Sequence, residues 1–258
     1  KAGNKSIPSV YGVVIDPCNY YFDASADSSV ADGSRNHPFT EFKKDFFPDS
    51  PLKFVHFHIR GTVVMPDDQF NLQTNCKITG SDNALLSFQK NSSLLLRLVS
   101  LEIDNCLINK IPSAGGSSAN ESLALFELEN AILSINGSEI VSQFDGSGTI
   151  IKGTSSAVMI KNSGLINQSA SYASIISGFD TRVQALNCRV SSIAQTAVNF
   201  SLHGGSLELR SSACKVVGSI GRIAELLGSE LSAAQNTFTG ELNSPRNESA
   251  VWKDSAAV

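Results

Sequence analysis

Charged residues are scarce in this chain. Only 17% of its 258 residues are charged, and Met occurs twice and Trp once. Soluble domains ordinarily carry about a quarter charged residues, so Ser, Thr, Asn and Gln must fill many outward positions here. The formal net charge of −4 argues against binding to nucleic acid, which needs a clustered basic face, and against strong attraction to anionic lipid.

Long apolar runs are also missing. The longest candidate, residues 94–99, is interrupted by Arg97, whereas a membrane-spanning helix needs about 20 apolar residues. We therefore expect no membrane span in this segment. The chain starts at Lys1 without a hydrophobic leader, so we expect either a removed signal peptide or a piece of a longer chain.

Closely paired cysteines such as CxxC, the usual signature of a metal site, are absent. Three of the five cysteines, Cys76, Cys106 and Cys188, share an Asn-Cys-x-Ile/Val context. In other copies of this pattern Ser or Asn takes the cysteine's place. A free Cys behaves as a small buried hydrophobe, so we expect buried free thiols. A disulfide that involves Cys18, or one between adjacent copies, is the alternative.

The feature that dominates the sequence is a repeat. Two apolar residues two positions apart, a small polar dipeptide and a further apolar residue recur with starts at residues 101, 133, 158, 183, 207 and 231. The last four steps are 25, 25, 24 and 24 residues, and a fixed period in this range indicates a repeat architecture. Each copy contains three short strands and no run of helical periodicity. This predicts an all-β, single-stranded parallel β-helix of about 8 coils, each stacked on the next.

The period also predicts the domain organisation. We expect a strand, a loop and a capping helix in residues 1–50, the β-helix in residues 51–242, and a tail or a linker to a further region in residues 243–258.

Two irregular segments interrupt this plan. Phe39, Phe42 and Phe46 recur at helical spacing before Pro48, which predicts a short helix that caps the open N-terminal end of the solenoid. Residues 111–122 are an extra loop between two copies. This loop is either a plain surface tether or part of a binding face, where insertions in repeat proteins tend to collect.

The opening segment contains Tyr21-Phe22-Asp23-Ala24, then Asp32-Gly33-Ser34 and His37-Pro38-Phe39-Thr40. Together with the Asn-Cys-x-Ile bends, it resembles the right-handed parallel β-helix proteins of the pectate-lyase-like superfamily. The resemblance covers about residues 20–242 and implies a right-handed coil with a helical cap. It implies little about activity, because the superfamily includes polysaccharide lyases, glycosidases, esterases, phage tailspikes and bacterial surface proteins.

Stacking of the copies aligns outward residues into columns. The first column contains Glu102, Ser134, Met159, Gln184, Glu208 and Ser232. Neither this column nor its neighbours place two carboxylates on adjacent coils. Glycosidases need two carboxyl groups about 5–9.5 Å apart, and calcium sites need several converging oxygen ligands. We therefore expect no catalytic column and no cofactor; Ca²⁺ is the one alternative, and no motif in the sequence supports it.

The best cluster for chemistry lies at a turn. Asp180 and Arg182 on one coil are predicted to lie beside His203 on the next, with Glu208 further along. An acid, a histidine and an arginine are suited to acid–base catalysis on an acidic sugar, or to binding it. The alternative is a solvated turn with a weak surface ion pair.

Two further groups carry metal-ligating side chains. His56 and His58 alternate on one strand face without a third ligand nearby, which favours ordinary polar positions. Asp23, Asp27 and Asp32 lie in a Ser/Gly-rich loop. Their spacing matches no calcium-binding motif, and Asp is common in turns for its own hydrogen bonds.

The balance of these features predicts a secreted or surface-exposed β-helix that acts as a stalk or adhesin-like binding module without catalysis. Its expected partner is a glycan or a host or cell-surface protein. The alternative is a carbohydrate-active enzyme, a polysaccharide lyase or glycosidase, that acts on acidic glycan through Asp180, Arg182, His203 and Glu208.

Overall fold

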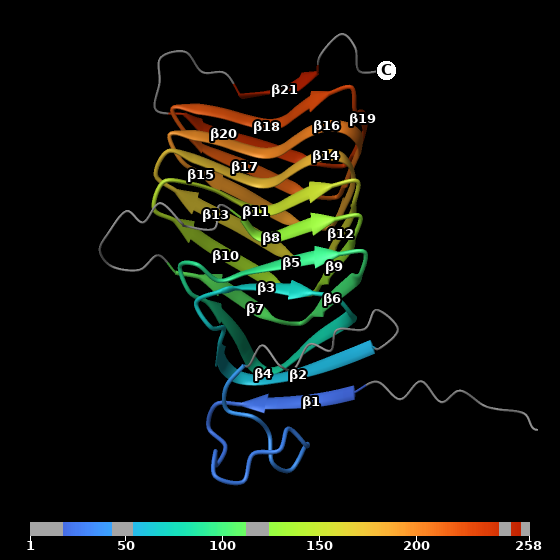
Figure 1. Ribbon diagram of the computed structural model, residues 1–258. Coiled ribbons are helices and arrows are strands. Elements are labelled where there is room, and N and C mark those ends of the chain that lie inside the picture. Colours follow the sequence, from blue (N-terminus) through green and yellow to red (C-terminus); the bar gives the residue numbers. More distant parts are fainter. Residues whose placement is uncertain (1–17, 43–53, 112–123, 243–248, 254–258) are drawn as a thin grey trace, which may run out of the picture.

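The structure is a computed structural model that describes residues 18–42, 54–111, 124–242 and 249–253. These residues form a parallel β-solenoid of about 7 turns (Figure 1). The all-β parallel β-helix predicted from the period is therefore confirmed, while its handedness stays a prediction. No helix in the described part of the chain has the length and apolarity that crossing a bilayer requires.

Three columns of parallel strands form the walls of the solenoid. The first column contains β1 (Cys18–Asp23), the N-terminal segments of β2 (Phe54–Val64) and β4 (Asn75–Phe88), β6 (Ser100–Asp104), β9 (Ile132–Asn136), β12 (Ala157–Lys161), the C-terminal segments of β14 (Tyr172–Leu186) and β16 (Thr196–Arg210), and β19 (Glu230–Ala234).

The second column follows the first around a bend. It contains the C-terminal segments of β2 and β4, then β7 (Leu107–Lys110), β10 (Glu139–Phe144), β13 (Gly164–Ser169), β15 (Arg189–Ile193), β17 (Ala213–Gly218) and β20 (Thr237–Leu242).

The third column closes each turn. It contains β3 (Gln69–Leu72), β5 (Ser93–Arg97), β8 (Ala124–Glu129), β11 (Ser147–Thr154), the N-terminal segments of β14 and β16, β18 (Ile220–Leu227) and β21 (Ser249–Lys253).

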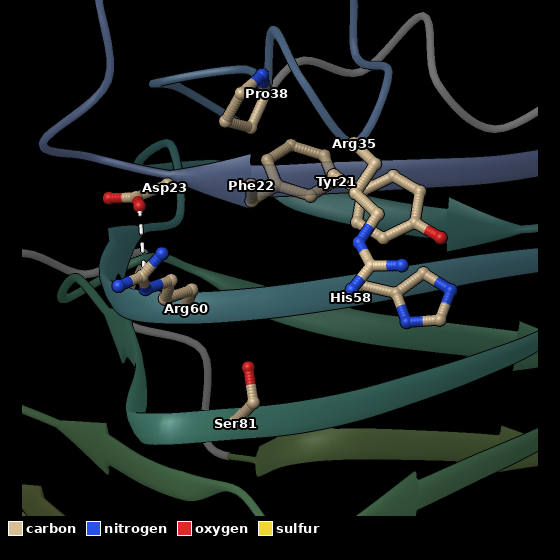
Figure 2. A pocket seen from close by; sticks show the side chains of 8 residues that line it. All are labelled: Tyr21, Phe22, Asp23, Arg35, Pro38, His58, Arg60 and Ser81. Atoms are coloured by element: carbon tan, nitrogen blue, oxygen red, sulfur yellow. Dashed lines mark ion pairs between the residues drawn. The ribbon is translucent and has the colours of Figure 1, made fainter.

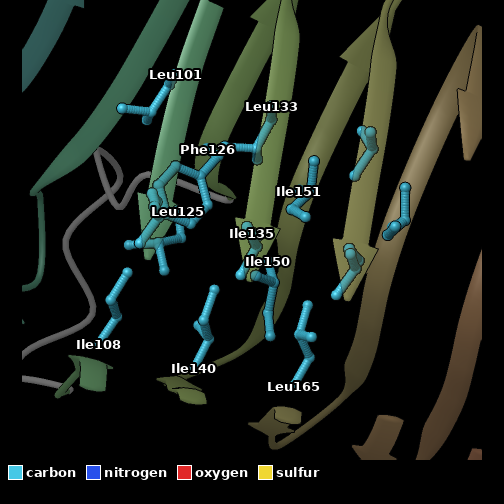
Figure 3. Packing of buried hydrophobic residues seen from close by; sticks show 14 of the residues in the cluster. Leu101, Ile108, Leu125, Phe126, Leu133, Ile135, Ile140, Ile150, Ile151 and Leu165 are labelled. Atoms are coloured by element: carbon cyan, nitrogen blue, oxygen red, sulfur yellow. The ribbon is translucent and has the colours of Figure 1, made fainter. Parts of the chain in front are cut away.

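The core is built from stacked apolar side chains at matching positions of successive turns. Ile140 pairs with Ile108 on one side and with Leu165 on the other, and Figure 3 shows these three side chains in one row inside the solenoid. All three are fully buried. Burial of each such side chain contributes about 1.5–3 kcal/mol. Because equivalent positions of successive turns pair, the sequence repeat is also the repeat of the core.

The bends between the first and second columns require a left-handed backbone. Asn105, Asn162 and Asn187 have φ values of 55°, 52° and 54°. Asn tolerates this region better than most residues because its short polar side chain forms local hydrogen bonds. The amide groups also form a ladder, since Asn187 Nδ2 donates to Asn162 Oδ1 at 2.9 Å.

The five cysteines are free, and four of them are buried, as predicted; Cys18 is exposed. One detail of the prediction is wrong, because Cys76 does not occupy a bend. It pairs with Val55 and Leu101 at an inward position in the middle of a strand, and the bend of that turn falls at Asn83, with φ 61°. The register of β4 against β2, and not the local Asn-Cys-x-Ile pattern, therefore decides where β4 bends.

The expected capping helix is not confirmed. Phe39 forms a parallel β-bridge with Phe22, and its N–H donates to the carbonyl oxygen of Tyr21 at 2.8 Å. The chain is therefore extended where the helix should begin, and residues 39–42 contain no helix. Residues 43–47 lie outside the described residues. Aromatic rings cover this end of the core, since Phe42 is buried against Phe22 and Phe57 at centroid distances of 5.1 and 5.3 Å.

Two predicted segments have different outcomes. The inserted loop is described only at Ile111, and residues 112–122 lie outside the described residues. Within the expected tail, residues 249–253 form β21, which pairs in parallel with β18. The solenoid therefore extends beyond Leu242.

Candidate functional site

The outward face of the first column is most polar at its N-terminal end. Strand β1 pairs in parallel with β2, which places Asn19 beside His56, Tyr21 beside His58 and Asp23 beside Arg60. Alternation along each strand points all six side chains to the outer face, because successive residues of a strand point to opposite faces. Residues 18–23 and 54–60 thus combine into one surface.

Two histidines and a tyrosine stack on this face. The Tyr21 and His58 rings are nearly parallel, with centroids 4.4 Å apart, and the His56 and His58 centroids are 3.8 Å apart. His58 Nε2 is 3.0 Å from Asn19 Oδ1, and His56 Nε2 is 2.9 Å from the Thr79 hydroxyl. Both imidazoles are therefore held in place by a hydrogen bond and by ring contacts.

Beside the stack lies a pocket of about 450 Å³. Its lining consists of Tyr21, Phe22, Asp23, Arg35, Pro38, His58, Arg60 and Ser81. Figure 2 shows Tyr21, Arg35 and His58 on one side of this pocket and Asp23 with Arg60 on the other. Small-molecule sites have volumes of about 300–1,000 Å³, so the pocket can hold a ligand of one or two rings.

The loop that carries Arg35 is fixed by backbone pairing. Tyr21 N–H donates to Gly33 O at 3.0 Å, and Gly33 N–H donates to His37 O at 2.9 Å. Gly33 has φ 82°, and a Cβ there would lie 2.2 Å from the Phe39 ring. Only glycine fits this turn, so the loop conformation that brings Arg35 to the pocket is specified locally.

The electrostatic balance of the pocket is positive at neutral pH. Burial, followed by the nearby Arg35 charge, lowers the pKa of His58, so this imidazole is neutral. Hydrogen bonds from Ser25, and then the Arg60 charge, lower the pKa of Asp23, so this carboxylate is ionised. Asp23 lies 3.7 Å from Arg60. The lining therefore carries two guanidinium groups and one carboxylate.

A second charged group borders the stack. Lys77 Nζ lies 2.7 Å from Asp104 and 3.3 Å from Glu102. The hydrogen bond to Asp104, more than that to Glu102, raises the pKa of Lys77. One ammonium group thus pairs with two carboxylates on this face.

The aspartates of the opening loop are used by their own turns. Asp23, Asp27 and Asp32 each accept a hydrogen bond from the backbone N–H of the serine two residues later, at 2.9, 2.9 and 2.8 Å. These bonds explain the acidic loop as turn chemistry. Across residues 18–42, 54–111, 124–242 and 249–253, no three His, Cys, Asp or Glu residues are grouped so that they could hold a metal ion.

The cluster predicted at the later turn is only partly assembled. His203 pairs with Phe179, the residue before Asp180, whereas Arg182 pairs with Ser206. Asp180, Arg182 and His203 are all exposed. Glu208 points outward from the first column, where it contacts Arg210 at 2.6 Å and Gln184 at 2.7 Å. The structure therefore places Asp180 and His203 at the same turn of neighbouring coils, with the Asp180 backbone beside Gly204, and leaves Glu208 in a separate ion pair.

Sequence reasoning missed Arg35, Arg60 and Tyr21 as site residues. The signal for Arg60 was present, because it continues the outward alternation of His56 and His58. Arg35 and Tyr21 carry no such signal, since their place beside His58 depends on the pairing of β1 with β2.

Comparisons with known proteins assign no relatives. No family model matches this chain, and no curated protein or solved structure is significantly similar to it.

Proposed function

We propose that this chain is a non-catalytic binding module, secreted or displayed at the cell surface, whose rigid solenoid presents the N-terminal pocket to an acidic glycan. The observation that carries the proposal is the pocket lining, in which Arg35 and Arg60 accompany Tyr21 and a single carboxylate. Arginine pairs with planar carboxylates through two parallel hydrogen bonds. A uronic acid supplies such a carboxylate together with hydroxyl groups for Tyr21 and Ser81.

The state of the two arginines supports this ligand class. Arg60 already contacts Asp23, at 3.7 Å. Among the described residues, no ion pair engages Arg35. Arg35 is therefore the cation most accessible to a ligand, and Arg60 lines the opposite side of the pocket.

Binding without catalysis is supported by how the carboxylates near the pocket are used. Asp23 is hydrogen-bonded by Ser25, and Glu102 and Asp104 share Lys77. A glycosidase needs one carboxyl group that stays protonated at its working pH. Hydrogen bonds from Ser25 lower the pKa of Asp23, so this carboxylate is unsuited to donating a proton. Glu102 and Asp104 are engaged by Lys77 on the surface beside the stack.

The test is titration of the protein with uronic-acid oligosaccharides and with neutral oligosaccharides of the same length. We expect the acidic series to bind more tightly and to weaken as salt rises. Arg35→Ala and Arg60→Ala should each weaken binding about tenfold or more. Arg97→Ala is the matched control, because Arg97 lies on the third column in an ion pair with Glu129.

Several outcomes would contradict parts of the proposal. Equal affinity for neutral oligosaccharides, or unchanged affinity in both arginine variants, would remove the pocket as the binding site. Release of shortened oligosaccharides would contradict the non-catalytic role. Recovery of the protein from the medium or from the surface of intact cells tests its location. Tight binding of a cell-surface protein that carries no glycan would show that the ligand is a protein and not an acidic glycan.

A carbohydrate-active enzyme remains the second candidate, favoured by one observation at the later turn. Phe179 is 64% exposed and pairs with His203 on the next coil, where its ring offers a stacking surface for a sugar. Cleavage of a uronate polymer that disappears in Asp180→Ala and in His203→Ala, while Arg35→Ala stays active, would establish this function in place of the first.

A further inference from the structure

A groove crosses the second column at Gly164. The outward residues of this column are Leu107, Glu139, Gly164, Arg189, Ala213 and Thr237. Cavities of about 430 and 300 Å³ meet there and share Glu139, Gly164 and Arg189 in their linings. The two cavities therefore form one shallow groove that runs from the Asn162 and Asn187 bends onto the outer face of the second column.

The missing side chain of Gly164 creates this groove. Its backbone is not left-handed, and an added Cβ would meet Glu139 and Arg189 atoms at 3.5–3.7 Å, which is ordinary contact. Neither backbone conformation nor packing requires glycine at this position. Glycine inside a strand lowers stability. Its structural consequence here is a notch that the Glu139 and Arg189 side chains cover, since Gly164 itself is buried.

The charged side chains above the notch are loosely paired. Arg189 Nη2 lies 3.9 Å from Glu139 Oε2, and the two side chains are 78% and 47% exposed. A long, exposed ion pair contributes little to stability, so a ligand can separate the two groups at low cost. Together they offer a hydrogen-bond acceptor and a donor, two turns apart.

The groove also has apolar residues beside the charged pair and amide side chains at its edge. Ile166 and Ala213 line the floor beside the charged pair, and the carboxamides of Asn162 and Asn187 line the rim. An acceptor, a donor and an apolar floor match a secondary amide that carries a methyl group. We propose that this groove binds the acetamido group of an N-acetylated amino sugar. Its N–H donates to Glu139, its carbonyl accepts from Arg189, and its methyl group packs on Ile166 and Ala213.

A peptide carries the same amide chemistry, but the sheet disfavours it. The three strands that line the notch, β10, β13 and β15, are each paired on both sides. An extended peptide binds a sheet through the free backbone groups of an edge strand, and this surface offers none. The Asn carboxamides at the rim instead suit the hydroxyl groups of a sugar ring.

The test compares three probes: a trimer of N-acetylglucosamine, a trimer of glucose and an N-acetylated dipeptide amide. We expect the N-acetylated sugar to bind at least tenfold more tightly than the other two. Gly164→Leu should fill the notch and weaken binding at least tenfold, and Thr237→Leu is the matched control, since it adds the same side chain to the same column outside the groove.

Variants of the charged pair and of the N-terminal pocket test the groove independently of Gly164→Leu. Glu139→Ala and Arg189→Ala should each weaken binding of the trimer, and they test the groove even where Gly164→Leu folds poorly. Arg35→Ala should leave it unchanged, which separates this site from the N-terminal pocket. The proposal is overturned by equal affinity for the glucose trimer, by full affinity in Gly164→Leu, or by a dipeptide that binds as tightly as the sugar.

Discussion

The backbone N–H of Cys188 donates to the hydroxyl of Ser212 at 3.1 Å, from one turn of the solenoid to the next. The same bond joins Cys106 N–H to Ser138 Oγ and Ser138 N–H to Ser163 Oγ, both at 3.1 Å. At these bends the serine hydroxyl is therefore the acceptor for the turn before it, and Asn236 Oδ1 accepts from Ser212 N–H in the same way. These bonds explain the serines and the asparagine of the repeat more fully than a need for small size does.

Ser212→Ala should destabilise the protein. The substitution leaves the buried N–H of Cys188 without its acceptor, and an unsatisfied buried donor costs about 1–3 kcal/mol. Urea denaturation followed by far-ultraviolet circular dichroism measures this loss. Cys188→Ser is the control, since serine occupies the equivalent position at Ser138 and Ser163 and the backbone bond to Ser212 is kept. Its free energy of unfolding should change by less than about 1 kcal/mol.

Asn199→Ile should stabilise the protein. Asn199 is fully buried, and both polar atoms of its amide lack a hydrogen-bond partner. Burial of an unpartnered amide costs about 1–3 kcal/mol, and isoleucine removes this penalty. Thermal unfolding measures the gain. Asn167→Val is the matched control with the opposite sign, because the Asn167 amide donates to Gly148 O and Ser174 O at 2.8 and 2.7 Å. A lower melting temperature in Asn199→Ile would contradict the prediction.

Stability should fall between neutral pH and pH 4 because of the stacked histidines. Burial, followed by the charges of His58 and Lys77, lowers the pKa of His56 from 6.5 to about 4, and burial also lowers the pKa of His58. Well above pH 6.5 both imidazoles are neutral whether the chain is folded or not. As pH falls below 6.5, the unfolded chain takes up protons that the folded chain resists, so the free energy of unfolding decreases.

His56→Gln should reduce this pH dependence. Urea denaturation at pH 7 and pH 5 measures it for the parent and for the variant. The aspartates with lowered pKa, Asp23, Asp27 and Asp32, lose their contribution only as pH approaches and falls below 3.8, so they do not interfere in this window. Equal losses in parent and variant would show that His56 does not carry the effect.

Gly205→Ala should be strongly destabilising. Gly205 has φ 85°, and a Cβ there would lie 2.2 Å from the carbonyl oxygen of Thr181. Both the backbone conformation and the contact oppose a side chain, so we expect a loss of more than about 2 kcal/mol. Gly164→Ala serves as the matched control and should be neutral or slightly stabilising, because its backbone suits alanine and its Cβ meets only ordinary contacts.

Most of the solenoid could be predicted from the sequence because its turns repeat. The pairing of Leu133 with Leu101 and Val158, and the left-handed bends at Asn162 and Asn187, follow from a period that can be read locally. The candidate site could not be predicted in the same way. Asn19 and His58, whose side chains share a hydrogen bond, are 39 positions apart and belong to no common repeat.

The period predicts which residues point inward, where the regular turns bend and which outward residues share a column. Three other features depend on the three-dimensional arrangement: Cys76 lies inside a strand, Arg35 lines a pocket with His58, and Gly164 leaves a notch between Glu139 and Arg189. A repeat encodes contacts between equivalent positions of successive turns. The first strand and its loop belong to no repeat, so their contacts cannot be predicted from the period. The same holds for Glu139 and Arg189, whose side chains cover the space beside Gly164.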